Sequence, residues 1–167
     1  EVKGKKLLIL GTGGAANAIS IQTALEGAAE ITIFNRRDEF FASGQKIVEK
    51  LAGEVPDCRA EMCDLEDQER LAAAVRDSDI LINATKVGMK PMDGDTLIPA
   101  ELLHPGLIVA DTVYNPLETR LLREAKEAGC QVIGGIGMLL WQGAAAFQLF
   151  TGREMPVKEV EERFFAE

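Results

Sequence analysis

A glycine-rich segment, G-T-G-G-A-A at positions 11–16, lies between an apolar run and a stretch with helical periodicity. It matches the pattern G-x-G-x-x-A, in which the first glycine permits a tight turn and the second lets a pyrophosphate approach the backbone. The start of the following helix offers free N–H groups and a partial positive charge to phosphates. A glycine-rich turn can also form for steric reasons alone, but its place after the first strand favours dinucleotide binding. The candidate phosphate-binding residues are Gly11, Thr12, Gly13, Gly14 and Ala15.

Two arginines and an acid follow the second apolar run, where a dinucleotide fold places its adenosine ribose. Guanidinium groups suit a ribose 2′-phosphate, whereas a carboxylate suits a free 2′-OH. The mixture leaves NAD and NADP both open, and solvent-facing charges that open a helix are the alternative interpretation. The same residues disfavour a methyltransferase, which usually places an acid at its adenosine ribose. The candidates here are Asn35, Arg36, Arg37 and Asp38.

Further candidates follow the fourth, fifth and sixth apolar runs. Lys86 lies in an irregular segment that is either a surface loop or a cofactor contact. Tyr114 is either a functional hydroxyl or a buried aromatic plug. The glycines around Gly135 indicate a close backbone approach, for example to a flat ring. Met138 and Gln142 share one helix face, and the amide of Gln142 needs either a ligand or a backbone partner if it is buried.

The elements that must position these residues alternate in type. Apolar runs predict strands over 5–10, 30–34, 58–63, 79–83, 107–113 and 131–133. Helical periodicity predicts helices over 16–26, 39–52, 65–76, 119–128, 137–150 and 156–165, with a short one starting at Pro99. This alternation predicts an α/β, Rossmann-like domain over residues 1–167, in which a doubly wound parallel sheet of about six strands has helices on both faces. Such sheets bind ligands at the carboxyl ends of their strands.

Composition restricts the function further. The 167 residues are 47% hydrophobic and 27% charged, which suffices for a folded core. A net charge of −9 argues against a nucleic-acid binder, because phosphate contacts need a basic surface. Three cysteines without C-x-x-C or a nearby histidine predict free thiols in a cytoplasmic protein, with neither a disulfide framework nor a metal site. No apolar stretch is long enough to predict a membrane span.

Four motifs together resemble one family. N-R-R, N-A-T-K-V-G-M-K-P, V-Y-N-P-L-E-T and G-M-L-L-W-Q-G-A-A-A-F-Q-L-F-T-G follow one another as in shikimate dehydrogenases. The resemblance runs from Lys5 to Pro156, and N-R-R-D-E-F-F and T-K-V-G-M-K-P are most similar to the quinate/shikimate branch. It implies a two-domain oxidoreductase that transfers a hydride reversibly between a cyclic hydroxy acid and NAD or NADP. This chain would be its C-terminal, cofactor-binding domain.

The resemblance also implies a role for each candidate. Positions 12–15 would hold the pyrophosphate, positions 35–38 would surround the adenosine ribose, and Lys86 would contact the cofactor near a ribose. Gln142 would point to the substrate hydroxyls, and Thr12 departs from the family's usual Ala, where its hydroxyl either adds a hydrogen bond or crowds the diphosphate. The residues expected on the nicotinamide side are Thr112, Val113, Tyr114, Asn115, Gly135 and Met138.

Catalysis is expected to need a second domain. In the family, a Lys and an Asp of the N-terminal domain carry the proton transfer, so this chain alone should bind cofactor without turnover. The sequence opens E-V-K-G directly before a strand, which predicts a piece of a longer polypeptide. Without its neighbour, the last two helices should expose Trp141, Phe164 and Phe165 and favour dimers. The alternatives are a stand-alone, non-enzymatic dinucleotide-binding module and a different bipartite dehydrogenase, the latter disfavoured by Gln142.

Overall fold

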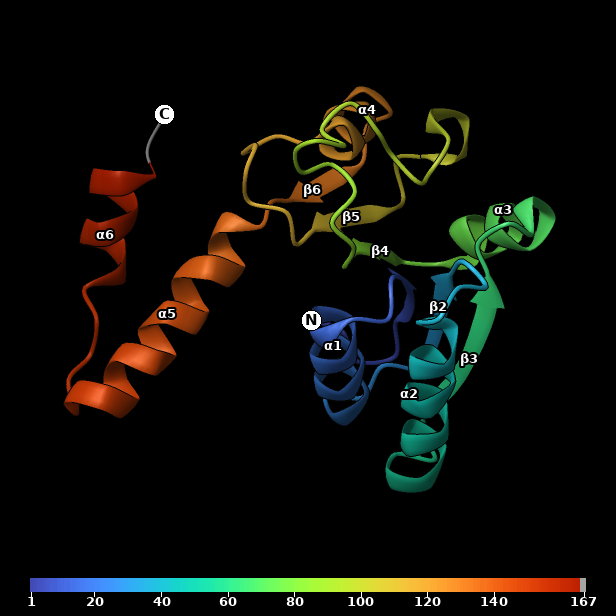
Figure 1. Ribbon diagram of the computed structural model, residues 1–167, viewed down its shortest axis with the longest axis horizontal. Helices are drawn as coiled ribbons and strands as arrows, with labels where there is room; N and C mark the ends of the chain where they lie inside the picture. Colours follow the sequence, from blue (N-terminus) through green and yellow to red (C-terminus); the bar gives the residue numbers. More distant parts are fainter. Residues whose placement is uncertain (166–167) are drawn as a thin grey trace.

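The fold is one parallel sheet covered by helices. The computed structural model describes residues 1–165, shown in Figure 1. Its strands lie in the order β3-β2-β1-β4-β5-β6, and every neighbouring pair is parallel. The chain therefore winds outward from β1 in both directions, so the topological switch point lies between β1 and β4. The strands are β1 (Lys6–Leu10), β2 (Glu30–Asn35), β3 (Arg59–Asp64), β4 (Ile80–Asn83), β5 (Ile108–Asp111) and β6 (Gln131–Ile133).

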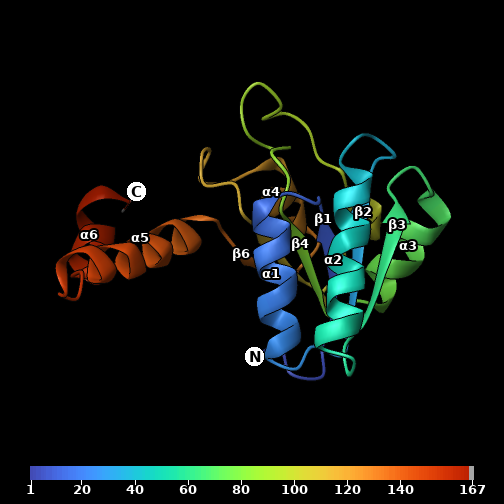
Figure 2. The same ribbon diagram turned by 60° about the horizontal axis from the view of Figure 1, so that its bottom comes forward.

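Helices cover both faces of this sheet, as predicted. One face carries α1 (Gly14–Leu25) and α2 (Phe41–Glu54), and the other carries α3 (Gln68–Asp77), the short 3-10 helix η1 (Ala100–Leu102) and α4 (Arg120–Glu127). The last two helices, α5 (Ile136–Thr151) and α6 (Val157–Phe164), extend away from the sheet in Figures 1 and 2. No helix in the described part of the chain has the length and apolar character needed to cross a membrane.

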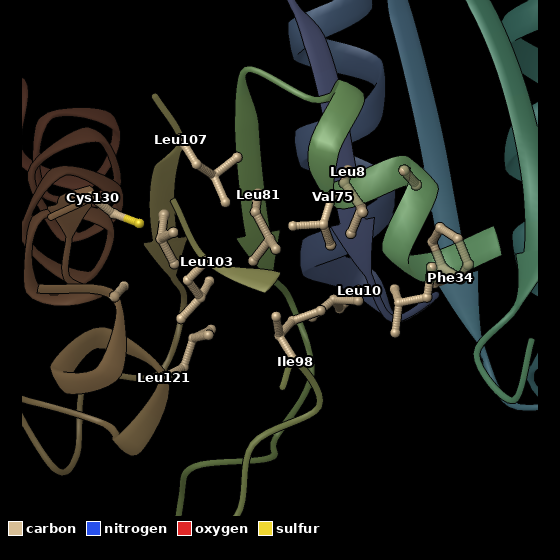
Figure 3. Packing of buried hydrophobic residues seen from close by; sticks show 14 of the residues in the cluster. Leu8, Leu10, Phe34, Val75, Leu81, Ile98, Leu103, Leu107, Leu121 and Cys130 are labelled. Carbon is tan, nitrogen blue, oxygen red and sulfur yellow. The ribbon is translucent and has the colours of Figure 1, made fainter. Parts of the chain in front are cut away.

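Two hydrophobic clusters hold the layers together, one on each face. Leu8 and Leu10 of β1 point toward α3 and α4, whereas Leu7 and Ile9 point toward α1 and α2. Figure 3 shows part of the first cluster, in which Phe34 and other side chains of the central strands meet those of the covering helices. Because both faces are buried, the central strands are continuous apolar runs rather than alternating ones.

Several boundaries differ from the sequence predictions for local reasons. Gly14 and Ala15 belong to α1 rather than to the glycine loop, because the helix begins directly after Gly13. Helix α3 begins three residues later than predicted, since Asp67 is its N-cap and accepts a hydrogen bond from the Arg70 amide at 2.9 Å. Strand β5 ends at Asp111 rather than at position 113. The residues after Asp111 are therefore loop, and they lie at the carboxyl edge of the sheet.

Candidate functional site

The glycine loop lies on the switch point. Gly11 has a φ of +101°, a conformation that side chains other than glycine's rarely adopt. A Cβ there would lie 2.9 Å from the Thr85 side chain and 3.0 Å from the Ala84 carbonyl oxygen. The Gly11 amide donates to the carbonyl of Phe34 at 2.8 Å. The loop thus contacts the chain after β4 and the end of β2 at once, which is possible only with glycine at this position.

The next two glycines leave space for a ligand. A Cβ built at Gly13 or Gly14 would meet no atom within 4 Å. Gly13 is the N-cap of α1, which has neither a side-chain cap nor an acidic residue in its first turn. The first N–H groups of a helix have no partner within the helix and carry its positive dipole end. An anionic group such as a pyrophosphate therefore fits this end of α1, and among residues 1–165 no side chain caps it.

The Thr12 side chain faces inward, toward the protein. It is buried, and its hydroxyl donates to the carbonyl oxygen of Phe40 at 3.0 Å. Its methyl group lies 2.7 Å from where a Cβ would be at Gly44 of α2, so Gly44 makes room for it. The Thr12 hydroxyl therefore ties the glycine loop to the start of α2.

Basic residues on α2 were missed by the sequence reasoning. A groove of about 480 Å³ beside the glycine loop is lined by Gly13 and Gly14 together with Lys46 and Lys50. The two lysines are four residues apart, so they lie on one face of the helix. That i, i+4 spacing was readable in the sequence, but only the packing of α2 beside α1 shows that this face borders the loop.

The two arginines after β2 have different surroundings. The Nε of Arg37 donates to Asp64 Oδ2 at 2.7 Å, and its guanidinium lies 5.0 Å from the centre of the Phe41 ring. The Glu66 amide and, to a lesser extent, Arg37 hold the pKa of Asp64 below its ordinary value. Arg36 instead lines two pockets at the carboxyl edge. Of the predicted pair, Arg36 is thus the arginine that a ligand can reach without breaking an ion pair.

A small pocket joins the end of β2 to the loop after β4. It has a volume of about 180 Å³ and is lined by Asn35, Arg36 and Asp38 on one side and by Lys86 on the other. Asp38 Oδ1 accepts hydrogen bonds from the Asn35 side chain at 3.0 Å and from the amide of Phe40 at 2.9 Å. The structure therefore brings together two groups of predicted residues that are about fifty positions apart in the sequence.

The remaining predicted residues lie on the other side of the switch point. Tyr114 is 45% exposed, so the buried-plug interpretation is wrong. A Cβ at Gly135 would lie 2.5 Å from the Val113 carbonyl oxygen, so the close approach at this glycine is to protein backbone. Met138 and Gln142 are exposed on α5, and Gln142 therefore needs no buried partner. Thr112 and Asn115 belong to the same loop as Val113 and Tyr114.

The cysteines and the histidine lie away from the glycine loop. Cys58, Cys63 and Cys130 are free thiols, as predicted, and burial raises the pKa of each. A ring nitrogen of His104 lies 3.4 Å from the Val75 carbonyl oxygen, on the face that carries α3. Within residues 1–165 no group of three or more His, Cys, Asp or Glu side chains could hold a metal ion.

Known proteins match this chain over nearly its whole length. A family model described as "Shikimate 5'-dehydrogenase C-terminal domain" matches residues 135–163. A shikimate dehydrogenase (NADP(+)) of Listeria monocytogenes serotype 4b (strain F2365) is 52% identical over 166 residues, which are 99% of this chain and 57% of the relative. The chain belongs to the shikimate dehydrogenase family. It corresponds to the C-terminal domain of that family and spans a little over half the length of the curated relatives it matches.

A second relative and a solved structure support this assignment. A quinate/shikimate dehydrogenase of Escherichia coli O139:H28 (strain E24377A / ETEC) is 48% identical over 97% of this chain and 56% of the relative. A crystal structure of the Listeria monocytogenes shikimate 5-dehydrogenase in complex with shikimate and NAD superposes with a TM-score of 0.94 at 52% identity, over 99% of this chain and 57% of that one. The Rossmann-like, doubly wound fold predicted from the sequence is therefore confirmed.

Proposed function

We propose that this chain is the NAD(P)-binding domain of a shikimate or quinate dehydrogenase. The observation that carries the proposal is the open, uncapped end of α1 at the switch point, where Gly13 and Gly14 leave room for a pyrophosphate. The Listeria relative, whose crystal structure is a complex with NAD and shikimate, supports it. The cytoplasmic location expected from the free thiols is part of the same proposal.

Most of the predicted residues have a role in this proposal, and Arg37 is the exception because it pairs with Asp64. The amides at the start of α1 bind the pyrophosphate, while Arg36 and Asp38 bind the adenosine ribose or its phosphate and Lys86 contacts the cofactor near a ribose. The loop 112–115, with Gly135 and Met138, lines the nicotinamide side. Gln142 reaches toward the hydroxyl groups of the substrate.

The reaction of the whole enzyme is reversible hydride transfer. When NAD or NADP is bound, its nicotinamide supplies the redox chemistry by accepting a hydride from the secondary alcohol carbon. The hydroxyl proton is transferred to a base. The family resemblance implies that a Lys and an Asp of the N-terminal domain carry this proton transfer. This chain positions the cofactor, and it is expected to bind without turnover when it is alone.

The exposed apolar surface of α5 and α6 supports a domain partner. Leu140 is the only buried residue of α5, whereas Trp141 is 67% and Phe150 87% exposed. A helix that is apolar on all sides is normally buried in protein. Ile133 of β6 is 51% exposed and pairs with Ala110, on the side of the sheet that carries α1. We propose that the preceding part of the same polypeptide packs on these residues.

Two measurements test whether another domain packs on these exposed apolar residues. At high concentration the chain alone should form dimers through its exposed helices, and Phe150→Glu should abolish them, as measured by sedimentation. A chain that stays monomeric at all concentrations would contradict the predicted dimer. Expressing the chain with the segment that precedes it in its gene should restore turnover of shikimate or quinate. A folded two-domain protein that binds cofactor but oxidises neither acid would contradict the proposed activity.

Calorimetric titration with NADP and NAD tests cofactor binding directly. Arg36→Ala should weaken the affinity for NADP by about tenfold or more, since a hydrogen bond to a charged group contributes about 1.5–3 kcal/mol. The affinity for NAD should change much less. Arg37→Ala is the matched control, because its guanidinium is engaged by Asp64 and Phe41. Failure of the unaltered chain to bind either cofactor would contradict the proposal, and an Arg37 effect equal to that of Arg36 would contradict the assignment of the phosphate contact.

A further inference from the structure

A carboxylate lies buried at the carboxyl end of β5 with no role in the site described so far. Asp111 is 3% exposed, and its hydrogen-bond partners are all uncharged. Burial raises the pKa of Asp111, which its hydrogen bonds only partly counter. Keeping a carboxylate away from water is costly, and the cost is tolerated only where hydrogen bonds replace the lost solvent.

Three donors converge on Asp111. Its Oδ1 accepts from the Asn83 side chain at 3.0 Å and from the Val113 amide at 2.9 Å. Its Oδ2 accepts from the Thr119 hydroxyl at 2.7 Å. Asn83 ends β4, Val113 lies in the loop after β5, and Thr119 is the N-cap of α4. One side chain therefore ties together two neighbouring strand ends and the start of the next helix.

Asn83 extends these ties into the loop after β4. Its Nδ2 also donates to the carbonyl of Val87 at 3.0 Å, and its Oδ1 accepts from the Thr85 hydroxyl at 2.7 Å. The Val87 amide donates to that hydroxyl at 3.1 Å. A Cβ at Gly88 would lie 3.1 Å from the Thr119 methyl group, so the loop packs directly against the N-cap of α4. The loop that carries the predicted cofactor contact is thus built around Asn83.

The loop before α5 rests on the same structure. A Cβ at Gly135 would lie 2.5 Å from the Val113 carbonyl oxygen and 2.7 Å from that of Thr112. These carbonyls belong to the two residues that follow Asp111, one of which donates its amide to the carboxylate. Three loops, after β4, β5 and β6, therefore share one buried anchor.

The adenosine side of the site also has hydrogen bonds of its own, which do not involve this anchor. The Gly11 amide donates to the Phe34 carbonyl at 2.8 Å, and the Thr12 hydroxyl donates to Phe40 at 3.0 Å. These bonds join the glycine loop to β2 and to the start of α2, on the far side of the switch point from Asp111. A change at Asp111 should therefore affect the nicotinamide half of a bound dinucleotide more than the adenosine half, which borders the anchored loops only where Thr85, Lys86 and Val87 line the pocket beside Arg36.

We propose that Asp111 is a positioning residue that holds the loops 84–88, 112–119 and 134–135 as one surface for the nicotinamide half of the dinucleotide. That a dinucleotide binds to this surface rests on the proposed function, whereas the anchoring of the loops does not. The residue acts through the loops and touches neither cofactor nor substrate.

Asp111→Asn tests the anchor, because it keeps the size of the side chain and replaces one acceptor oxygen by a donor. Asp79→Asn is the matched control. Asp79 directly precedes β4 at the opposite end of the sheet, where its carboxylate accepts from the Lys6 amide at 2.9 Å. Thr119→Val should reproduce the effect of Asp111→Asn, and Thr119→Ser should restore the behaviour of the unaltered chain, because it keeps the hydroxyl.

Two readouts separate positioning from a general loss of stability. Hydrogen exchange of the unliganded chain should quicken at the Val87 and Val113 amides in Asp111→Asn, but not at Gly11. In Asp111→Asn, calorimetry should show the affinity for NADP weakened by about tenfold, equivalent to about 1.4 kcal/mol. The affinity for adenosine 2′,5′-bisphosphate should change by less than about twofold. Asp79→Asn should leave both affinities unchanged.

Each possible result bears on the proposal. Unchanged exchange at Val87 and Val113 would overturn the anchor. Equal weakening of NADP and of its adenosine half would overturn the positioning role and indicate a general structural one. Faster exchange in Asp111→Asn, together with an unaltered chain that binds no dinucleotide, would support the anchor and overturn the proposed function instead.

Discussion

Replacing Gly13 by Asp should stabilise the protein and abolish cofactor binding at the same time. Gly13 is the N-cap of α1, with φ −77° and ψ −171°, and no atom lies within 4 Å of a Cβ placed there. Asp adopts this extended conformation readily and is among the favoured N-cap residues. Its carboxylate would accept hydrogen bonds from the same free N–H groups that a pyrophosphate needs.

The expected changes in folding stability and in cofactor affinity have opposite signs. A better cap adds a few tenths of a kcal/mol, a negative charge at a helix start about 0.3–1 kcal/mol, and the loss of glycine's freedom in the unfolded chain about 0.4–1 kcal/mol. A net gain of about 1 kcal/mol raises Tm by about 2–4 °C in a chain of this size. Losing two charge-assisted hydrogen bonds costs about 3 kcal/mol in binding, on the order of 100-fold.

Thermal unfolding and calorimetric titration of NADP measure the two effects. Gly53→Asp is the control, because a Cβ at Gly53 is equally unobstructed but lies in the last turn of α2. A negative charge at the C-terminal end of a helix is unfavourable, and the loss of glycine's freedom in the unfolded chain offsets this cost, so this variant should change little in stability and bind normally. A Gly13→Asp variant that still binds NADP within about twofold of the unaltered chain would refute the assignment of this helix start as the phosphate site. A variant that is less stable would refute the capping argument.

Two other predictions concern stability. Gly11→Ala should destabilise the fold by about 2–4 kcal/mol in urea unfolding, because it adds a Cβ at positive φ that meets Thr85 at 2.9 Å; a smaller loss would mean that the loop relaxes. The Lys6 amide, and then Lys5, lower the pKa of Asp79 below 3.8. The stability from this group is present above the unfolded pKa and is lost as the pH falls through the folded one. Asp79→Asn should therefore lose less stability on acidification below about pH 4, and identical acid profiles would contradict this.

Much of the fold could be predicted because its signals are local. Strands buried on both faces are short apolar runs such as 6–10 and 80–83, and their alternation with helical periodicity implies parallel pairing. Helix ends depended on single side chains. Thr119 and Gly152 mark theirs clearly, whereas the predicted start of α3 at Leu65 is wrong, because Asp67 caps the helix by accepting a hydrogen bond from the Arg70 amide.

The site was predictable as a set of segments but not as a set of contacts. The N-R-R-D motif does not reveal that Arg37 pairs with Asp64, because that pairing depends on the β2–β3 register, which places Asn35 beside Asp64. Likewise, the inward turn of the Thr12 hydroxyl depends on how α2 packs, and the convergence of three loops on Asp111 depends on the order of the strands. These contacts join residues far apart in the sequence, and no local pattern encodes them.

Because the start of α5 is held in place, a small tilt there would move the far end of the helix over a larger distance. Sixteen residues at 1.5 Å each give a rod about 24 Å long. Its N-cap, Gly135, packs closely against the Thr112 and Val113 carbonyls, so the start of the helix cannot pivot freely. A tilt of about 10° forced on the base would move the far end by about 4 Å over that length. A methyl group added at Gly135 would thus displace the distant end of α5 as well as the Thr112 and Val113 carbonyls that it contacts directly.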